Sequence, residues 1–140
     1  MADTNKTLLS TLSFPTDKHI RQNAVESIIN EIDRNRIKLT IGREELYLIV
    51  DEAITNAMEH GNSWDPSKKI NVELISNTSH FYIYITDEGK GFNTKTIIKE
   101  LNNRNVLSTR GRGIYIISQF CELSWNDRGN QFKMKIPKGN

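Results

Sequence analysis

Three polar side chains recur every four residues in the middle of the chain, at Glu52, Asn56 and His60. If this segment is helical, all three project from one face in successive turns. A carboxamide oxygen can ligate Mg²⁺, and a carboxylate one turn away can accept a proton from an attacking hydroxyl. The spacing therefore suits nucleotide chemistry, while each residue taken alone is equally consistent with a solvated polar stripe.

A second polar segment, Asp87-Glu88-Gly89-Lys90-Gly91, follows a run of residues with strand-like alternation. A carboxylate at the end of a strand can accept a hydrogen bond from an exocyclic amine, and glycines let backbone approach a flat ring closely. A glycine-rich turn without a ligand is the plain alternative. The segment matches neither a dinucleotide-binding fingerprint nor a Walker loop, because the chain has no G-x-G-x-x-G opening a helix and no G-x-x-x-x-G-K-[ST].

A third segment, Gly111-Arg112-Gly113, precedes a strongly apolar run over residues 114–120. If that run is a helix, its first N–H groups form an anion site, to which Arg110 and Arg112 add positive charge. A flexible loop ending against a buried element is the alternative. The length of the apolar run does not decide between helix and strand.

The elements that must position these segments follow from the hydrophobic pattern. We expect strands at 7–14, 69–75, 81–86, 123–125 and 131–136, helices from Thr16 or Asp17 to about 35 and over 42–60, a short helix at 94–101, and a mobile stretch at 101–112. Helices clustered among antiparallel hairpins predict an α+β two-layer sandwich, in which helices cover one face of a mixed, mainly antiparallel sheet.

Composition narrows the class of protein. A chain of 140 residues with 36% hydrophobic residues predicts a single domain over 1–140, with loose ends at about 1–6 and 137–140. A net charge of +2 argues against direct nucleic-acid binding. The single Cys121 excludes an internal disulfide, and no apolar run approaches the roughly 18 residues of a membrane span. We therefore expect a cytoplasmic protein that reaches membranes only through a partner.

The three polar segments together resemble the boxes of the GHKL (Bergerat-fold) ATP-binding superfamily. Residues 51–62 resemble its N box, 87–92 its next box, and 110–114 the glycine box that closes the ATP lid. The motif D-E-A-x-x-N-A and the final motif G-R-G are most similar to those of the RsbW/SpoIIAB-type serine/threonine kinases that act as anti-sigma factors. The resemblance covers nearly the whole chain and implies the Bergerat fold, with an ATP lid at about 92–112.

The resemblance also implies a role for each residue of the three boxes. By matching position these are Glu52 as general base, Asn56 as Mg²⁺ ligand, Asp87 as reader of the adenine amine, Gly89 and Gly91 as walls of the base pocket, and Gly111 and Gly113 at the phosphates with Arg110 and Arg112 as helpers. His60 either reaches the phosphate end of the nucleotide or stabilises the end of its helix.

The implied reaction transfers the γ-phosphoryl group of ATP to a serine or threonine of a STAS-domain anti-sigma factor antagonist, with ADP as product. A sigma factor would be held in the alternative state, and ordering of the lid by the γ-phosphate would bias the choice. Apolar residues on the first strand and helix leave a homodimer open. Cys121 stands where an acidic residue is expected, which puts partner contacts in question.

Two other readings stay open. An isolated catalytic domain of the histidine kinase type would need a helical segment with a phosphorylatable histidine, and the N-terminal region offers only His19. An ATP-gated binding protein without kinase activity would be expected to lack Glu52. Transducer-linked ATPases of the gyrase, chaperone or mismatch-repair kind are set aside, because 140 residues leave no room for their second domain.

Overall fold

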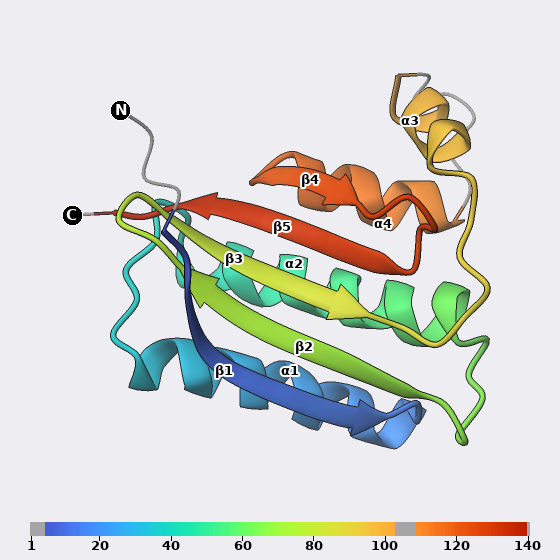
Figure 1. Cartoon of the computed structure of the whole chain (residues 1–140), viewed down its shortest axis with the longest axis horizontal. Helices are drawn as coiled ribbons and strands as arrows, with labels where there is room; N and C mark the ends of the chain where they lie inside the picture. The colour runs from blue at the N-terminus through green and yellow to red at the C-terminus, as the bar shows by residue number, and fades with distance from the viewer. Residues whose placement is uncertain (1–4, 103–108, 140) are drawn as a thin grey trace.

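The computed structural model describes residues 5–102 and 109–139 and has two layers, a five-stranded sheet and a layer of helices packed on one of its faces (Figure 1). The strands are β1 (Thr7–Pro15), β2 (Lys69–Ser76), β3 (His80–Thr86), β4 (Glu122–Trp125) and β5 (Gln131–Pro137). Their order is β1-β2-β3-β5-β4, and every pairing in the described part of the chain is antiparallel. The predicted α+β sandwich is confirmed, and its sheet is antiparallel rather than mixed.

The helices lie in chain order between these strands. They are α1 (Lys18–Arg34), α2 (Arg43–Asn56), the π-helical turn η1 (Ala57–Gly61), α3 (Thr94–Asn102) and α4 (Thr109–Ser118). Helices α1, α2 and α4 cover the same face of the sheet, whereas α3 stands beside it (Figure 1). Of the two residues expected to cap α1, Asp17 does so, since its Oδ1 accepts a hydrogen bond of 2.7 Å from the backbone N–H of His19.

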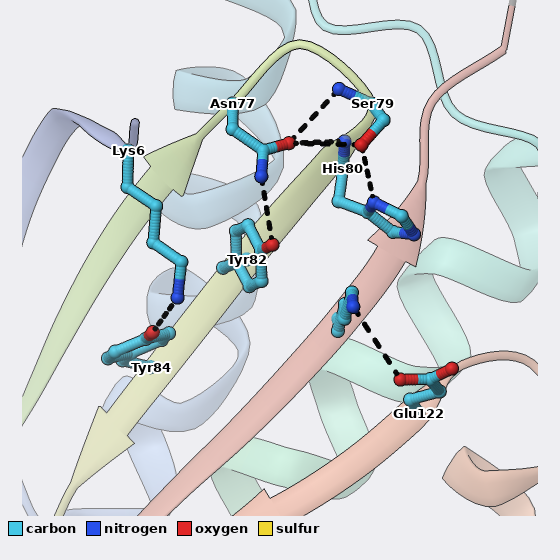
Figure 2. A network of polar contacts seen from close by, with 8 residues as sticks. Lys6, Asn77, Ser79, His80, Tyr82, Tyr84 and Glu122 are labelled. Atoms are coloured by element: carbon cyan, nitrogen blue, oxygen red, sulfur yellow. Dashed lines mark hydrogen bonds and ion pairs between the residues drawn. The ribbon is translucent and has the colours of Figure 1, made fainter. Parts of the chain in front are cut away.

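The core lies between the sheet and these helices. Alternate residues of β3, namely Phe81, Ile83 and Ile85, are buried against it, as the alternating pattern predicts. The buried stripe of α1 repeats at helical spacing and includes Ile28 and Ile32. The turn between β2 and β3 is closed by Asn77, whose Oδ1 accepts hydrogen bonds from the backbone N–H groups of Ser79 and His80 (Figure 2).

The helix expected over 42–60 ends differently from a regular α-helix. It widens after Asn56 into η1, and the N–H of Asn62 donates to the carbonyl of Ala57, five residues back. Such widened turns are frequent at functional sites. The chain then leaves the helix at Gly61, where it packs against the segment that follows β3.

The glycine box also differs from expectation. Gly111 and Gly113 lie inside α4, which begins at Thr109, rather than in a loop ahead of it. The apolar run after them is therefore helical. The physical reason is close packing of α4 on α2, because Gly111 is buried and a β-carbon at Gly113 would lie 2.8 Å from Oε2 of Glu52. Of the lid expected over 92–112, α3 forms one part, and residues 103–108 lie outside the described part of the chain.

The ends expected to be loose need correction wherever they are described. Lys6 Nζ donates a hydrogen bond of 3.1 Å to Tyr84 Oη. Lys138 pairs with Leu39, and the N–H of Gly139 donates to the carbonyl of Lys38 at 2.9 Å. These contacts tie Lys6 to β3 and the residues after β5 to the connection between α1 and α2. Within the described residues, no helix is both long enough and apolar enough to cross a membrane.

Candidate functional site

Asn56, at the last position of α2, has an amide oxygen without a visible partner. The residue is 8% exposed, its Oδ1 is fully buried, and no described group donates a hydrogen bond to that atom. Buried polar atoms in native proteins are nearly always hydrogen-bonded, so an orphaned acceptor requires an explanation. A carboxamide oxygen is a ligand type that Mg²⁺ accepts. The side chain therefore fits the predicted metal ligand.

Glu52 lies one turn earlier on the same helix and faces α4. It is partly buried, and its Oε2 fills the space that a side chain at Gly113 would occupy. Burial raises the pKa of this carboxyl, and the charge of neighbouring Asp51 raises it further, while Arg21 opposes the shift. A carboxyl with a raised pKa is a stronger base once ionised, which suits a general base.

Arg21 of α1 joins the two helices beside Glu52. Its guanidinium forms an ion pair with Asp51 and donates a hydrogen bond of 3.3 Å to Thr55 Oγ1. Asp51 and Thr55 are one helical turn apart on α2, so a single side chain contacts successive turns. This contact sets the charge balance around Glu52.

Asp87 follows β3 and is buried against the end of η1. Its Oδ1 accepts a hydrogen bond of 2.8 Å from the N–H of Gly89. A β-carbon at Gly61 would overlap the Asp87 carboxylate, and one at Gly89 would overlap the carbonyl oxygen of Gly61. Only glycines allow this approach, so two segments far apart in sequence form one cradle around the carboxylate.

Gly91 packs against the turn of the hairpin that β4 and β5 form. It has φ +83°, a conformation that favours glycine, and a β-carbon there would overlap the carbonyl oxygen of Arg128. The neighbouring N–H of Phe92 donates to the same carbonyl at 3.1 Å. Gly91 therefore positions the start of the expected lid against the turn between β4 and β5.

Asn62 is a residue of this site to which the motifs assigned no role. It is 0% exposed, and its amide nitrogen donates to Thr16 Oγ1 at 2.8 Å and to the carbonyl of Lys69 at 3.0 Å. Its Oδ1 accepts from the backbone N–H of Glu88 at 2.8 Å. One buried amide thus ties the end of η1 to the segment that holds Asp87. The only signal in the sequence is an asparagine directly after Gly61, which reads as an ordinary helix stop.

The remaining candidates lie around this centre. His60 is in the π-helical turn, with Nε2 3.5 Å from the carboxylate of Glu59. Gly111 is buried in the first half of α4, Arg112 is exposed next to it, and Arg110 precedes them in the first turn. The contact between α2 and α4 brings the glycine box to Glu52, and the contact of Gly61 with Asp87 brings in the second box.

Comparison with known proteins bears on the same region. A family model described as the histidine kinase-like ATPase domain matches residues 16–136, a span that includes all three boxes. Sensor protein VraS of Staphylococcus aureus is 28% identical over 110 residues, which are 79% of this chain and 30% of VraS. VraS of Staphylococcus haemolyticus gives the same identity and coverage. The match thus spans less than a third of the length of these relatives.

A solved structure shares the fold. The mycobacterial sensor histidine kinase MprB superimposes with a TM-score of 0.55 at 14% identity, covering 92% of this chain and 98% of that chain. At that identity the likeness concerns the fold alone. These comparisons agree with the ATPase superfamily expected from the boxes, and the relatives named here are sensor proteins rather than anti-sigma kinases.

Proposed function

Because the chain belongs to the family of histidine kinase-like ATPase domains, we propose that it binds ATP with Mg²⁺ and transfers the γ-phosphoryl group to a side chain of a partner protein, leaving ADP. The observation that carries the proposal is the orphaned, buried Oδ1 of Asn56, one turn from the carboxylate of Glu52. A hard oxygen ligand for Mg²⁺ and a carboxylate of raised pKa on one helix suit phosphoryl transfer, and the carboxylate suits most a hydroxyl acceptor.

In this mechanism Asn56 would hold Mg²⁺, which would neutralise charge on the phosphates. Glu52 orients the attacking group and, where that group is a hydroxyl, accepts its proton. The bond from the acceptor to the γ-phosphorus forms as the bond from that phosphorus to the bridging oxygen breaks, and ADP leaves with the bridging oxygen. Gly113 leaves room for Glu52 against α4, and the first turn of α4, which includes Gly111, would face the phosphates.

Nucleotide identity would be read at Asp87. Its carboxylate is oriented by the N–H of Gly89 and packed against Gly61, which supports a fixed acceptor for the exocyclic amine of adenine. Guanine carries a carbonyl at the corresponding position and would be repelled by the carboxylate. Asn62 positions this segment and has no direct chemical role.

The first candidate acceptor is a histidine of a partner protein. It is supported by the likeness over 79% of the chain to sensor protein VraS and by the fold shared with a sensor histidine kinase. A neutral imidazole already carries a lone pair and attacks without first losing a proton. On this reading the chain acts as a histidine kinase-like catalytic domain.

The second candidate acceptor is a serine or threonine, as in an anti-sigma factor kinase that phosphorylates a STAS-domain antagonist and holds a sigma factor in the alternative state. The observation that favours it is the raised pKa of Glu52, because a hydroxyl must give up its proton during attack and an imidazole need not.

One labelling experiment tests the proposal and separates the acceptors. The chain is incubated with Mg²⁺, ATP radiolabelled at the γ-phosphate, and candidate histidine-containing and STAS-domain proteins. Label that is lost in acid and kept in alkali identifies phosphohistidine, whereas label that survives acid identifies phosphoserine or phosphothreonine. Firm ATP binding without any labelling would instead indicate a nucleotide-gated binding protein.

Two variants and one control test the site by ATP binding and by the labelling assay. Asn56→Ala should abolish Mg²⁺-dependent ATP binding, while Glu52→Gln should bind ATP and lose phosphoryl transfer by roughly 10²–10⁴-fold. Asn30→Ala, an exposed change on α1, is the matched control and should behave as wild type. Undiminished Mg²⁺-dependent binding by Asn56→Ala would refute the role of this residue.

A further inference from the structure

The face of the sheet that the helices leave uncovered carries alternating tyrosines and lysines. Strand register places Tyr82 of β3 beside Lys135 of β5, and Tyr84 beside Lys133. Because alternate residues of a strand share a face, all four side chains lie opposite the core-facing row that includes Ile83. The two strands therefore present two tyrosine–lysine pairs on one surface.

Lys6 adds a third positive charge from the edge of the sheet. Its Nζ donates to Tyr84 Oη at 3.1 Å and lies 4.3 Å from the centre of the Tyr82 ring (Figure 2). Lys133 Nζ lies 5.1 Å from the centre of the Tyr84 ring. Ammonium groups above ring faces are held by electrostatic attraction, so the cations are oriented rather than dispersed.

These side chains enclose a shallow pocket of about 260 Å³, which we name the lysine–tyrosine pocket. It is lined by Lys6, Tyr82, Tyr84, Glu122, Leu123, Ser124, Lys133 and Lys135. Its floor is aromatic, and its walls carry the ammonium groups of three lysines and the carboxylate of Glu122. This carboxylate lies 3.9 Å from Lys135 Nζ. The pocket is thus concave and positively charged.

We propose that the lysine–tyrosine pocket binds an acidic segment of a partner protein in an extended conformation. Lys133 and Lys135 are two residues apart on a strand, hence roughly 6.6 Å apart along it. Alternate residues of an extended peptide repeat at the same distance, so carboxylates at every second position would meet both lysines. The partly exposed Tyr84 ring would receive the apolar parts of the segment, while the buried Tyr82 forms the floor beneath Lys6.

The charge pattern favours a peptide over other anions. Glu122 borders the pocket, and Glu73 pairs with Tyr84 on the same face. A nucleic-acid backbone carries a charge at every nucleotide, so these two carboxylates would repel it. A peptide with acidic residues at every second position can place its carboxylates against the lysines and away from Glu73 and Glu122. A second copy of this chain packed face to face by a two-fold axis would bring lysines toward lysines.

Helix α2, which carries both Glu52 and Asn56, covers one face of the sheet (Figure 1). The pocket residues of β3 and β5 alternate with the buried residues that face the helices, so the pocket lies on the opposite face. A segment bound there would leave the candidate nucleotide site open. The proposal therefore stands apart from the proposed kinase function and is tested by binding alone.

The test measures fluorescence anisotropy of two labelled synthetic peptides with the whole chain at low salt, one alternating Glu with Val and the other alternating Gln with Val. The acidic peptide should bind wild type about tenfold more tightly, with the difference shrinking as salt rises. The double variant Lys133→Gln, Lys135→Gln should lose that preference, and Lys133→Arg, Lys135→Arg should keep it. The control Lys95→Gln, Lys99→Gln on exposed α3 should also keep it.

Several results would overturn the proposal. Equal affinity of wild type for both peptides would show that the protein does not recognise the carboxylates of the peptide. An undiminished preference in the glutamine variant would place the binding site outside the lysine–tyrosine pocket. Tighter binding of a single-stranded oligonucleotide of matched charge would assign the pocket to nucleic acid. Self-association in sedimentation equilibrium that the glutamine variant abolishes would assign it to a second copy.

Discussion

The bare α-carbon of Gly61 packs directly against the carboxylate of Asp87, so that a β-carbon at position 61 would overlap both Cγ and Oδ2 of the aspartate. The carbonyl oxygen of Gly61 in turn occupies the place where a side chain at Gly89 would begin. The end of the π-helical turn and the segment after β3 are therefore joined through two glycines, and the position of Asp87 depends on both.

Replacing Gly61 by serine should destabilise the protein by about 1–3 kcal/mol, because the new side chain must displace a buried carboxylate or the backbone around it. ATP binding should weaken as well, since Asp87 moves. The matched control is Gly42→Ser, where a β-carbon meets only the carboxylate end of the flexible Glu45 side chain and serine is a good helix cap. Urea unfolding measures both, and an equal loss in the two variants would refute the argument.

Asn62→Ala should lower the stability of the protein by more than the loss of one hydrogen bond, because the Asn62 amide joins several segments. It leaves the carbonyl of Lys69 and the N–H of Glu88 without their partner inside the protein, at a cost of roughly 2–5 kcal/mol. Asn62→Asp keeps an acceptor for the N–H of Glu88 and should lose less affinity for ATP than the alanine variant. Urea unfolding and ATP titration measure the two effects, and a stability equal to that of Asn30→Ala would contradict them.

Local patterns predicted most of the fold. The alternation of Phe81, Ile83 and Ile85 identified β3 because burial on one face of a strand repeats every two residues. The start of α4 was not predictable in the same way, because Gly111 and Gly113 are poor helix formers and the packing of Gly113 against Glu52 appears only in the folded chain. The widened turn after Asn56 likewise leaves no periodic signal.

The candidate site was predictable where one segment carries the chemistry. Glu52 and Asn56 lie on one helix, so their spacing alone placed them together. Asn62 could not be found that way, because its partners Thr16 and Glu88 are 46 and 26 residues away in the chain. The link from Arg21 through Asp51 to Glu52 also joins separate helices and appears only once the chain is folded.

Cys121 should be unreactive in the folded protein. Burial raises the pKa of its thiol from 9.0 to about 12, and the charge of Glu122 adds to the shift, so little thiolate exists near neutral pH. A disulfide reagent that attacks thiolates should modify it slowly in buffer and rapidly in denaturing urea. Equal rates in the two solutions would mean that the thiol is not protected by the fold.

The charge balance around Glu52 should be visible in the pH dependence of phosphoryl transfer. Its raised pKa keeps the carboxyl protonated at pH values where a free glutamic acid is ionised, so activity that needs the ionised base falls as the pH is lowered through that value. Asp51→Asn removes a charge that raises this pKa and should move the acidic limb to lower pH. Arg21→Gln removes a charge that lowers it and should move the limb to higher pH.

The opposite directions of these two shifts distinguish electrostatics from structural damage, because either variant breaks the same Arg21–Asp51 ion pair. A merely structural effect would change the rate in the same sense for both and leave the limb in place. Carbon-13 NMR titration of the Glu52 carboxyl gives the same comparison without any activity assay. Shifts of equal sign in the two variants, by either method, would show that the group controlling the acidic limb is not Glu52.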